Sequence, residues 1–132
     1  MPPVSKPPLV LRWLPALAMM GVIFLASSLP ASDLPFFGRW DVWLKKGGHA
    51  LGYGLLGLSY FYALPQRLSG GYRRWMAWLM AVVFALSDEF HQSFVEGRGS
   101  TLTDVGIDSL GAGLSLLLVS AYSSNPDSNT PS

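Results

Sequence analysis

The chain has 132 residues, the length of a single domain, and half of them are hydrophobic. Only 13% are charged, whereas soluble domains carry about 25%, and the mean hydropathy is +0.34. This composition indicates an integral membrane protein. A net charge of +1 gives no reason to expect nucleic-acid binding, and the lack of cysteine excludes disulfides and thiolate chemistry.

Four windows contain no Lys, Arg, Asp or Glu: residues 13–32, 47–66, 75–87 and 109–126. A helix needs about 20 residues to cross about 30 Å of hydrocarbon. The third window is too short alone and spans a bilayer only if its helix continues to about Phe94. We therefore predict an all-α, polytopic membrane protein. Its four transmembrane helices should form an up-down bundle over residues 10–29, 47–64, 75–94 and 102–122.

The ends of the chain differ from this membrane domain, which we expect over residues 9–122. Residues 1–8 contain four prolines and residues 123–132 are polar, so both segments are predicted to be disordered. The first apolar stretch has an alternative interpretation as a cleaved signal peptide, with a poor cleavage site at residues 29–31. Its length, and the proline at that site, favour a retained helix.

Small residues mark the expected helix contacts. Gly48 and Gly52 lie four apart in the second predicted helix, where Gly54 and Gly57 add further gaps, and Ser109 and Gly113 lie four apart in the fourth. In a bundle, such spacing lets a neighbouring backbone approach closely. We therefore expect Gly52→Leu to disturb the bundle. Residues 101–104 match a capping box, which predicts that the fourth helix begins near Leu102.

The orientation follows from the positive-inside rule, by a small margin. With the amino terminus in the cytoplasm, five basic residues lie inside and four outside. We expect a multi-pass protein of the bacterial inner membrane with both termini in the cytoplasm and residues 32–46 outside.

Polar chemistry is concentrated in one short region. Five of the eight acidic residues lie between Asp88 and Asp108. In an up-down bundle, this region shares one membrane face with Ser27 and Ser28 and with the start of the second helix. Ionisable groups within a membrane are functional candidates by default. The candidates for acid–base chemistry are Asp88, Glu89, His91 and His49, and those for binding are Lys46, Tyr53, Gln92, Arg98, Asp104 and Asp108.

These residues also carry a resemblance. The string Asp88-Glu89-x-His91-Gln92, followed by Gly97-Arg98 and Asp104, resembles the pattern of the VanZ-like family of small bacterial membrane proteins. That pattern has asparagine where this chain has Asp108, which adds a carboxyl group to the pocket. The resemblance implies a link to low-level resistance to teicoplanin, a lipoglycopeptide that acts at the outer membrane face. It implies no settled biochemical activity.

Three classes of function are compatible with the residues. The first is a non-enzymatic envelope protein with an outward-facing pocket for an amphiphile or envelope component. The second is a membrane-embedded hydrolase or transferase acting on a lipid-like substrate. In it, Asp88 or Glu89 is the base, His91 or His49 its partner, and Arg98 holds an anionic headgroup. The third is a structural or assembly partner of another membrane complex. The expected partners are the lipid bilayer and an amphiphilic or envelope-derived ligand, and protein partners stay open. We predict neither a cofactor nor a bound metal.

Overall fold

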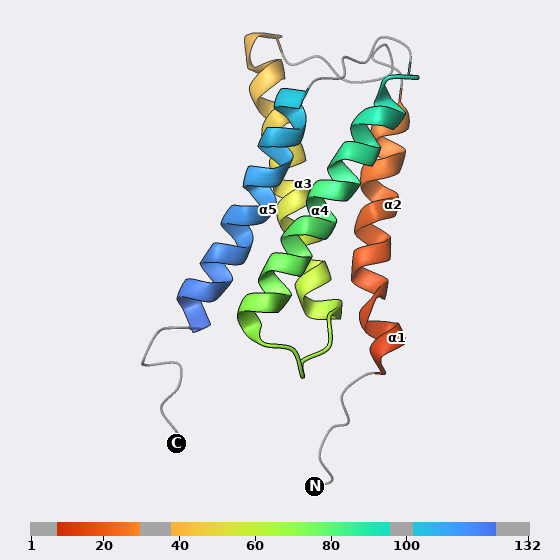
Figure 1. Cartoon of the computed structure of the whole chain (residues 1–132). Helices are drawn as coiled ribbons and strands as arrows, with labels where there is room; N and C mark the ends of the chain where they lie inside the picture. The colour runs from red at the N-terminus through yellow and green to blue at the C-terminus, as the bar shows by residue number, and fades with distance from the viewer. Residues whose placement is uncertain (1–7, 30–37, 96–101, 124–132) are drawn as a thin grey trace, which may run out of the picture.

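The computed structural model describes residues 8–29, 38–95 and 102–123, and this described part of the chain is helical, without a strand. Its elements, in order, are α1 (Leu9–Arg12), α2 (Leu14–Ser28), the 3-10 turn η2 (Gly38–Trp40), α3 (Asp41–Ala63), α4 (Gly70–Gln92) and α5 (Leu102–Ser123). Four long helices alternate in direction along the chain (Figure 1). The all-α prediction is therefore confirmed.

The first predicted helix is divided at Trp13, one residue before α2 begins, and Pro15 occupies the first turn of α2. Proline is tolerated there because the first N–H groups of a helix have no internal partner. The helix ends at Ser28 because Leu29 is extended, with φ −74° and ψ 130°. Leu29 precedes Pro30, and the residue before a proline is disfavoured in the helical region.

Two helix starts differ from those predicted. The second long helix, α3, begins at Asp41 instead of residue 47, so its first turns include charged residues that we had placed in a loop. Asp41 lies in the first turn, where the helix dipole favours an acid, and Lys45 pairs with it at 2.9 Å. The third, α4, begins at Gly70 instead of residue 75, because the Ser69 side chain caps it by accepting from the Tyr72 amide at 3.2 Å. It also ends at Gln92, two residues before Phe94.

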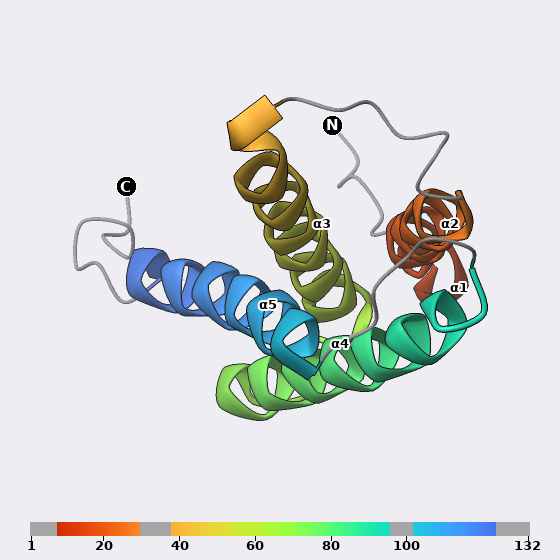
Figure 2. The same cartoon turned by 90° about the horizontal axis from the view of Figure 1, so that it is seen from above.

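Helix α3 is the centre of the packing. It contacts α2, α4 and α5, and its contact with α5 is the most extensive. These two helices run in the same direction, although neighbours in an up-down bundle usually run in opposite directions (Figure 1). Helices α2 and α5 share no contact within the described segments. Seen from above, α3 therefore lies between α2 and α5, and α4 runs alongside all three, at the lower edge of the view (Figure 2).

Small residues allow α3 and α5 to lie close together. A Cβ added to Gly111 would lie 2.2 Å from the carbonyl oxygen of Ala50, and one added to Gly57 would lie 3.3 Å from Ala112 Cβ. The Ser115 hydroxyl also donates to the Gly54 carbonyl at 2.9 Å. Glycine here provides the room that the two backbones occupy.

The two glycines singled out by their spacing do not make this contact. A Cβ on Gly52 would meet only Ile23 of α2, at 3.8 Å, and one on Gly48 would meet nothing within 4 Å. Gly52 therefore faces a side chain of α2 and not a neighbouring backbone, and the effect of Gly52→Leu stays a prediction. The helix rotates by about 100° per residue, and the glycines that face α5 are Gly54 and Gly57.

Among the described residues, two stretches are long and apolar enough to cross a membrane, Leu9–Ser28 and Leu102–Ala121. Large apolar side chains also cover much of the outer surface of the helices. Leu25, Leu51, Val83 and Leu118 are each about 60–70% exposed, and none belongs to the core. Such a surface suits contact with lipid better than contact with water.

The end of α3 is closed by two arginines. The Arg12 guanidinium donates to the Tyr62 carbonyl and lies 4.8 Å from the centre of the Tyr62 ring. Arg73 donates to the Phe61 carbonyl at 2.7 Å and lies 4.2 Å from the Phe61 ring. The last carbonyls of a helix lack internal partners and attract cations, so the two arginines cap α3.

This capping leads to a prediction for stability. Arg12→Met keeps an apolar stem but removes a charged donor, and we expect a loss of about 2 kcal/mol of unfolding free energy. Thermal unfolding in detergent measures it. Arg67→Met is the control, because Arg67 is exposed and does not contact α3 carbonyls. Equal stability of the two variants would show that Arg12 does not cap α3.

Candidate functional site

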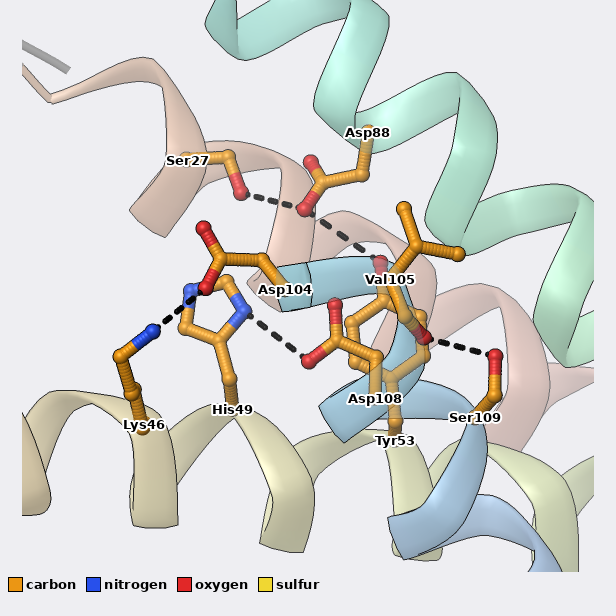
Figure 3. A network of polar contacts seen from close by, with 9 residues as sticks. All are labelled: Ser27, Lys46, His49, Tyr53, Asp88, Asp104, Val105, Asp108 and Ser109. Atoms are coloured by element: carbon orange, nitrogen blue, oxygen red, sulfur yellow. Dashed lines mark hydrogen bonds and ion pairs between the residues drawn. The ribbon is translucent and has the colours of Figure 1, made fainter. Parts of the chain in front are cut away.

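At one end of the bundle α2 and α4 end and α3 and α5 begin (Figure 1). The polar side chains gather at this end. Each of the four helices contributes at least one of them (Figure 3). The up-down arrangement brings these residues together although they are far apart in the sequence. We call this group the polar cluster; its members are Ser27, Ser28, Lys46, His49, Tyr53, Asp88, Glu89, His91, Gln92, Asp104 and Asp108.

Asp88 joins three helices. Its Oδ2 atom accepts hydrogen bonds from the Ser27 hydroxyl of α2 at 2.9 Å and from the Tyr53 hydroxyl of α3 at 3.3 Å (Figure 3). Ser27 and Tyr53 are fully buried, and Asp88 is 3% exposed. A buried carboxylate loses its hydrogen bonds to water. The two hydroxyl donors replace part of them and so stabilise the charge.

Helices α3 and α5 face each other through two acid–base pairs. Lys46 Nζ lies 2.8 Å from Asp104 Oδ1, and His49 Nδ1 lies 3.6 Å from Asp108 Oδ1 (Figure 3). The first pair is partly exposed, whereas Asp108 is 1% exposed. The distance from His49 Nδ1 to Asp108 Oδ1 exceeds that of an ordinary hydrogen bond. The contact is an ion pair when His49 is protonated, because only then is the imidazole charged.

Further along α4, His91 stacks on Phe24 of α2, with ring centres 4.3 Å apart and planes 18° apart. Its Nε2 atom lies 3.5 Å from the Ser28 hydroxyl. The Ser28 proton is directed elsewhere, because Ser28 donates to the Phe24 carbonyl at 2.8 Å. Glu89 and Gln92 are also buried, at 6% and 3% exposed.

Several buried polar atoms of the cluster have no hydrogen-bond partner among the described residues. They include Asp88 Oδ1, His91 Nδ1, Gln92 Nε2 and both carboxylate oxygens of Asp108. More than nine-tenths of buried polar groups in proteins are hydrogen-bonded, and leaving one unsatisfied costs about 1–3 kcal/mol. In the described part of the chain, unsatisfied polar atoms of the cluster are thus concentrated at one end of the bundle.

The residues predicted for the site are thus largely placed together. Arg98 lies outside the described residues. The acid–base pairing differs from the expected one, because His49 faces Asp108 and His91 lies beside Ser28, while Asp88 contacts hydroxyl groups. Within residues 8–29, 38–95 and 102–123, no three His, Asp or Glu side chains are arranged to hold a metal ion.

One contact of the site could not be found from the sequence. Phe24 holds the His91 ring, but it is a single apolar residue in a long apolar run and differs in no way from its neighbours. Finding it requires knowing which face of α2 is turned toward α4, that is, the rotation of α2 about its own axis. Ser27 was placed at the correct face, although its bond to Asp88 was not predicted.

The fold and the site together define a helical membrane protein with a buried polar cluster at one end. The VanZ/LLP1 family model matches residues 12–123, which include every described residue of that cluster, so the chain belongs to the VanZ-like family. No curated protein and no solved structure matches the chain.

Proposed function

We propose that the chain crosses the membrane four times, with the polar cluster near the outer face of the bacterial inner membrane. Helices α3, α4 and α5 have 23, 23 and 22 residues, and α1 and α2 together cover the 20 residues of Leu9–Ser28. At 1.5 Å per residue each reaches about 30 Å, the thickness of the hydrocarbon core. Both termini then lie in the cytoplasm.

Reporter fusions test this topology. Fusions at Gly70 and at the carboxyl end are expected to score as cytoplasmic, and a fusion at Gly38 as external, because three helices separate Gly38 from the carboxyl end. A cytoplasmic signal at Gly38 would reverse the orientation. External signals at all three sites would contradict the four-span arrangement.

We further propose that the polar cluster binds the headgroup of an amphiphile or envelope component, without catalysing a reaction. The observation that carries this proposal is the set of buried atoms on Asp88, Gln92 and Asp108 that have no hydrogen-bond partner among the described residues. Two of these side chains are carboxylates, which accept hydrogen bonds when ionised. The ligand should therefore present ammonium, amide N–H or hydroxyl groups.

Membership in the VanZ-like family suggests which ligand the cluster binds. The polar cluster, near the outer face, would bind an amphiphilic antibiotic of the teicoplanin type, or the envelope component that such an antibiotic uses. We propose that the chain thereby contributes to glycopeptide resistance or to envelope integrity. Its partner is then a small amphiphile supplied from the outer leaflet.

A test separates binding from structure at Gln92. Gln92→Met keeps the approximate volume and removes the buried amide whose nitrogen has no partner in the described part of the chain. The folded protein should be as stable as before, or slightly more stable, since an unsatisfied group is lost. Resistance to a teicoplanin-type lipoglycopeptide, measured as growth of a susceptible host expressing the chain, should fall to that of the host alone.

The matched control is Ser87→Met, on the same helix. Ser87 is exposed and bonds only to the Val83 carbonyl of its own helix, at 3.1 Å. This variant should keep both stability and resistance. If Gln92→Met also keeps resistance, the headgroup does not use this amide, and a host unaffected by the unaltered chain would refute the resistance role itself.

A membrane-embedded enzyme is the second candidate, and one contact favours it. Asp108 lies at Nδ1 of His49, where a carboxylate orients an imidazole so that Nε2 accepts a proton. The same geometry does not favour Ser28 as a nucleophile, because its proton is directed to the Phe24 carbonyl. If the chain is an enzyme, the purified protein should hydrolyse a lipid-like ester or phosphoester, and His49→Gln should abolish the product. Absence of any product would leave binding as the function.

A further inference from the structure

A second site lies at the opposite end of the bundle, between α4 and α5. These helices cross at an angle (Figure 2), and an open groove of about 480 Å³ lies between them. This volume is within the range of about 300–1,000 Å³ that is usual for ligand pockets. On α4 the groove is lined by Gly71, Arg74, Trp75 and Trp78, which share one helix face at spacings of three and four residues.

The α5 side repeats the same spacing with Gly113, Leu116, Leu117 and Ser120. Helices α4 and α5 run in opposite directions, so Gly71 of α4 and Ser120 of α5 lie at the same end of the groove. The deep end is apolar: a Cβ on Gly113 would lie 3.3 Å from Trp78 Nε1, so the indole lies against the α5 backbone. The groove therefore changes from a polar rim to an apolar floor.

Arg74 is the charge at the rim. A Cβ added to Gly70 would lie 3.2 Å from an Arg74 guanidinium nitrogen, so the guanidinium lies back over the first turn of α4. Arg12 and Arg73 at this end are occupied by carbonyls of α3. Arg74, by contrast, makes no hydrogen bond or ion pair with any residue that the structure describes.

Within the described segments, no carboxylate compensates this charge. The acidic residues of the described segments are Asp41, Asp88, Glu89, Asp104 and Asp108. All of them lie at the start of α3 or α5 or the end of α4, which is the end with the polar cluster. The end with Arg74 is therefore purely basic in the described part of the chain, and it attracts an anion.

From the groove and its charge we infer that α4 and α5 bind one anionic membrane phospholipid at this end, with its phosphate on Arg74 and an acyl chain against Trp78 and Leu116. Arginine holds phosphate through two parallel N–H bonds. Arg74 is four residues from the start of α4, about 6 Å along the axis, which is near the depth of a headgroup. Basic pockets between membrane helices are known to take such lipids.

A second copy of the chain fits the groove less well. A symmetric dimer through this face would bring Arg74 of one copy toward Arg74 of the other, because a two-fold interface uses the same patch twice. Like charges at that distance oppose association. A lipid phosphate supplies the opposite charge, and its acyl chain matches the apolar floor.

The experiment compares lipids and variants directly. The full chain is reconstituted in nanodiscs of phosphatidylcholine with a minor fraction of phosphatidylglycerol, then released, and the retained lipid is identified by native mass spectrometry. We expect one retained phosphatidylglycerol. Arg74→Gln should reduce it about tenfold, equivalent to about 1.4 kcal/mol of binding free energy. Arg67→Gln removes a nearby exposed arginine that does not line the groove and should leave retention unchanged.

A second variant tests the apolar half. Leu117 is 66% exposed, so Leu117→Trp should fold normally and partly fill the groove, lowering retention while Arg74 is intact. Inorganic phosphate alone should give no thermal stabilisation, since the acyl contact is missing. Equal retention in the Arg74→Gln and Arg67→Gln variants would overturn the proposal, as would equal retention of phosphatidylcholine. Dimerisation that survives Arg74→Gln and is lost with Leu117→Trp would assign the groove to a second copy instead.

Discussion

Gly111→Ala is expected to cost about 3 kcal/mol or more of unfolding free energy, the largest effect of any methyl group added to the described helices. The added Cβ would lie 2.2 Å from the Ala50 carbonyl oxygen and 2.9 Å from Ala50 Cα, which are backbone atoms of α3. A side chain could rotate away from such a clash, but backbone cannot, so α3 and α5 must separate. Overpacking of this kind usually costs about 1–3 kcal/mol, and more where the neighbours are rigid.

The loss should be visible as a lower midpoint of thermal unfolding in detergent, followed by circular dichroism. Gly106→Ala is the matched control, on the same helix, because a Cβ there meets nothing within 4 Å. It should be neutral or stabilising by about 0.5–1 kcal/mol, since alanine favours a helix more than glycine. Equal midpoints for the two variants would mean that α3 and α5 are not in backbone contact at Ala50.

Separation at Gly111 should also reach the polar cluster. His49 precedes Ala50, and Asp108 lies one helical turn before Gly111, so the close contact and the His49–Asp108 pair share one segment of the interface. The small residues therefore set the distance at which the acid faces the imidazole. A conservative change that preserves the fold but widens this interface would weaken the pair.

The sequence predicted that small residues join these helices, and it identified some of the right ones. Of the four glycines expected to face a neighbour, Gly54 and Gly57 contact α5, whereas Gly48 and Gly52 do not; the contact of Gly111 with α3 was not predicted. Spacing shows which residues share a face of one helix. It does not show toward which neighbour that face is turned, because the rotation of a helix depends on all of its partners at once.

The same limit applied to the site. Alternation of helix direction was enough to bring Ser27, His49, Asp88 and Asp108 to one end. The partners were not predictable, because a pair requires both the height along the axis and the rotation of two helices. The start of α3 was also not predicted. The charged residues at 41–46 are typical of a loop, yet they form the first turns of α3, and from there Lys46 pairs with Asp104.

Asp108 is where this chain differs from the pattern that the resemblance implies. That pattern would have asparagine at this position, and a neutral amide needs no counter-charge. A carboxylate that is 1% exposed does need one, and His49 lies where it can supply it. The extra acid is thus tied to a histidine on the facing helix, which gives this chain a titratable pair beside Asp88.

Asp88 is the residue whose replacement should affect function most. Asp88→Asn keeps a carbonyl oxygen that can accept from Ser27 and Tyr53, as Oδ2 does at 2.9 and 3.3 Å. The fold should therefore be retained, with a change in unfolding free energy of about 1 kcal/mol or less. The charge is lost, and so is the acceptor character of Oδ1, the buried oxygen without a partner in the described segments. Ligand binding and resistance should be abolished.

Asp88→Leu removes the acceptor as well, so that the buried hydroxyls of Ser27 and Tyr53 lose their common partner. Each unsatisfied group costs about 1–3 kcal/mol, and the variant should unfold at a clearly lower temperature in detergent. Ser27→Ala combined with Asp88→Leu should recover part of that loss, since one orphaned hydroxyl is gone. The two arms separate the roles of the residue. If Asp88→Asn keeps full resistance while Asp88→Leu unfolds, Asp88 only ties α2, α3 and α4 together. If Asp88→Asn folds normally and resistance disappears, its charge acts on the ligand.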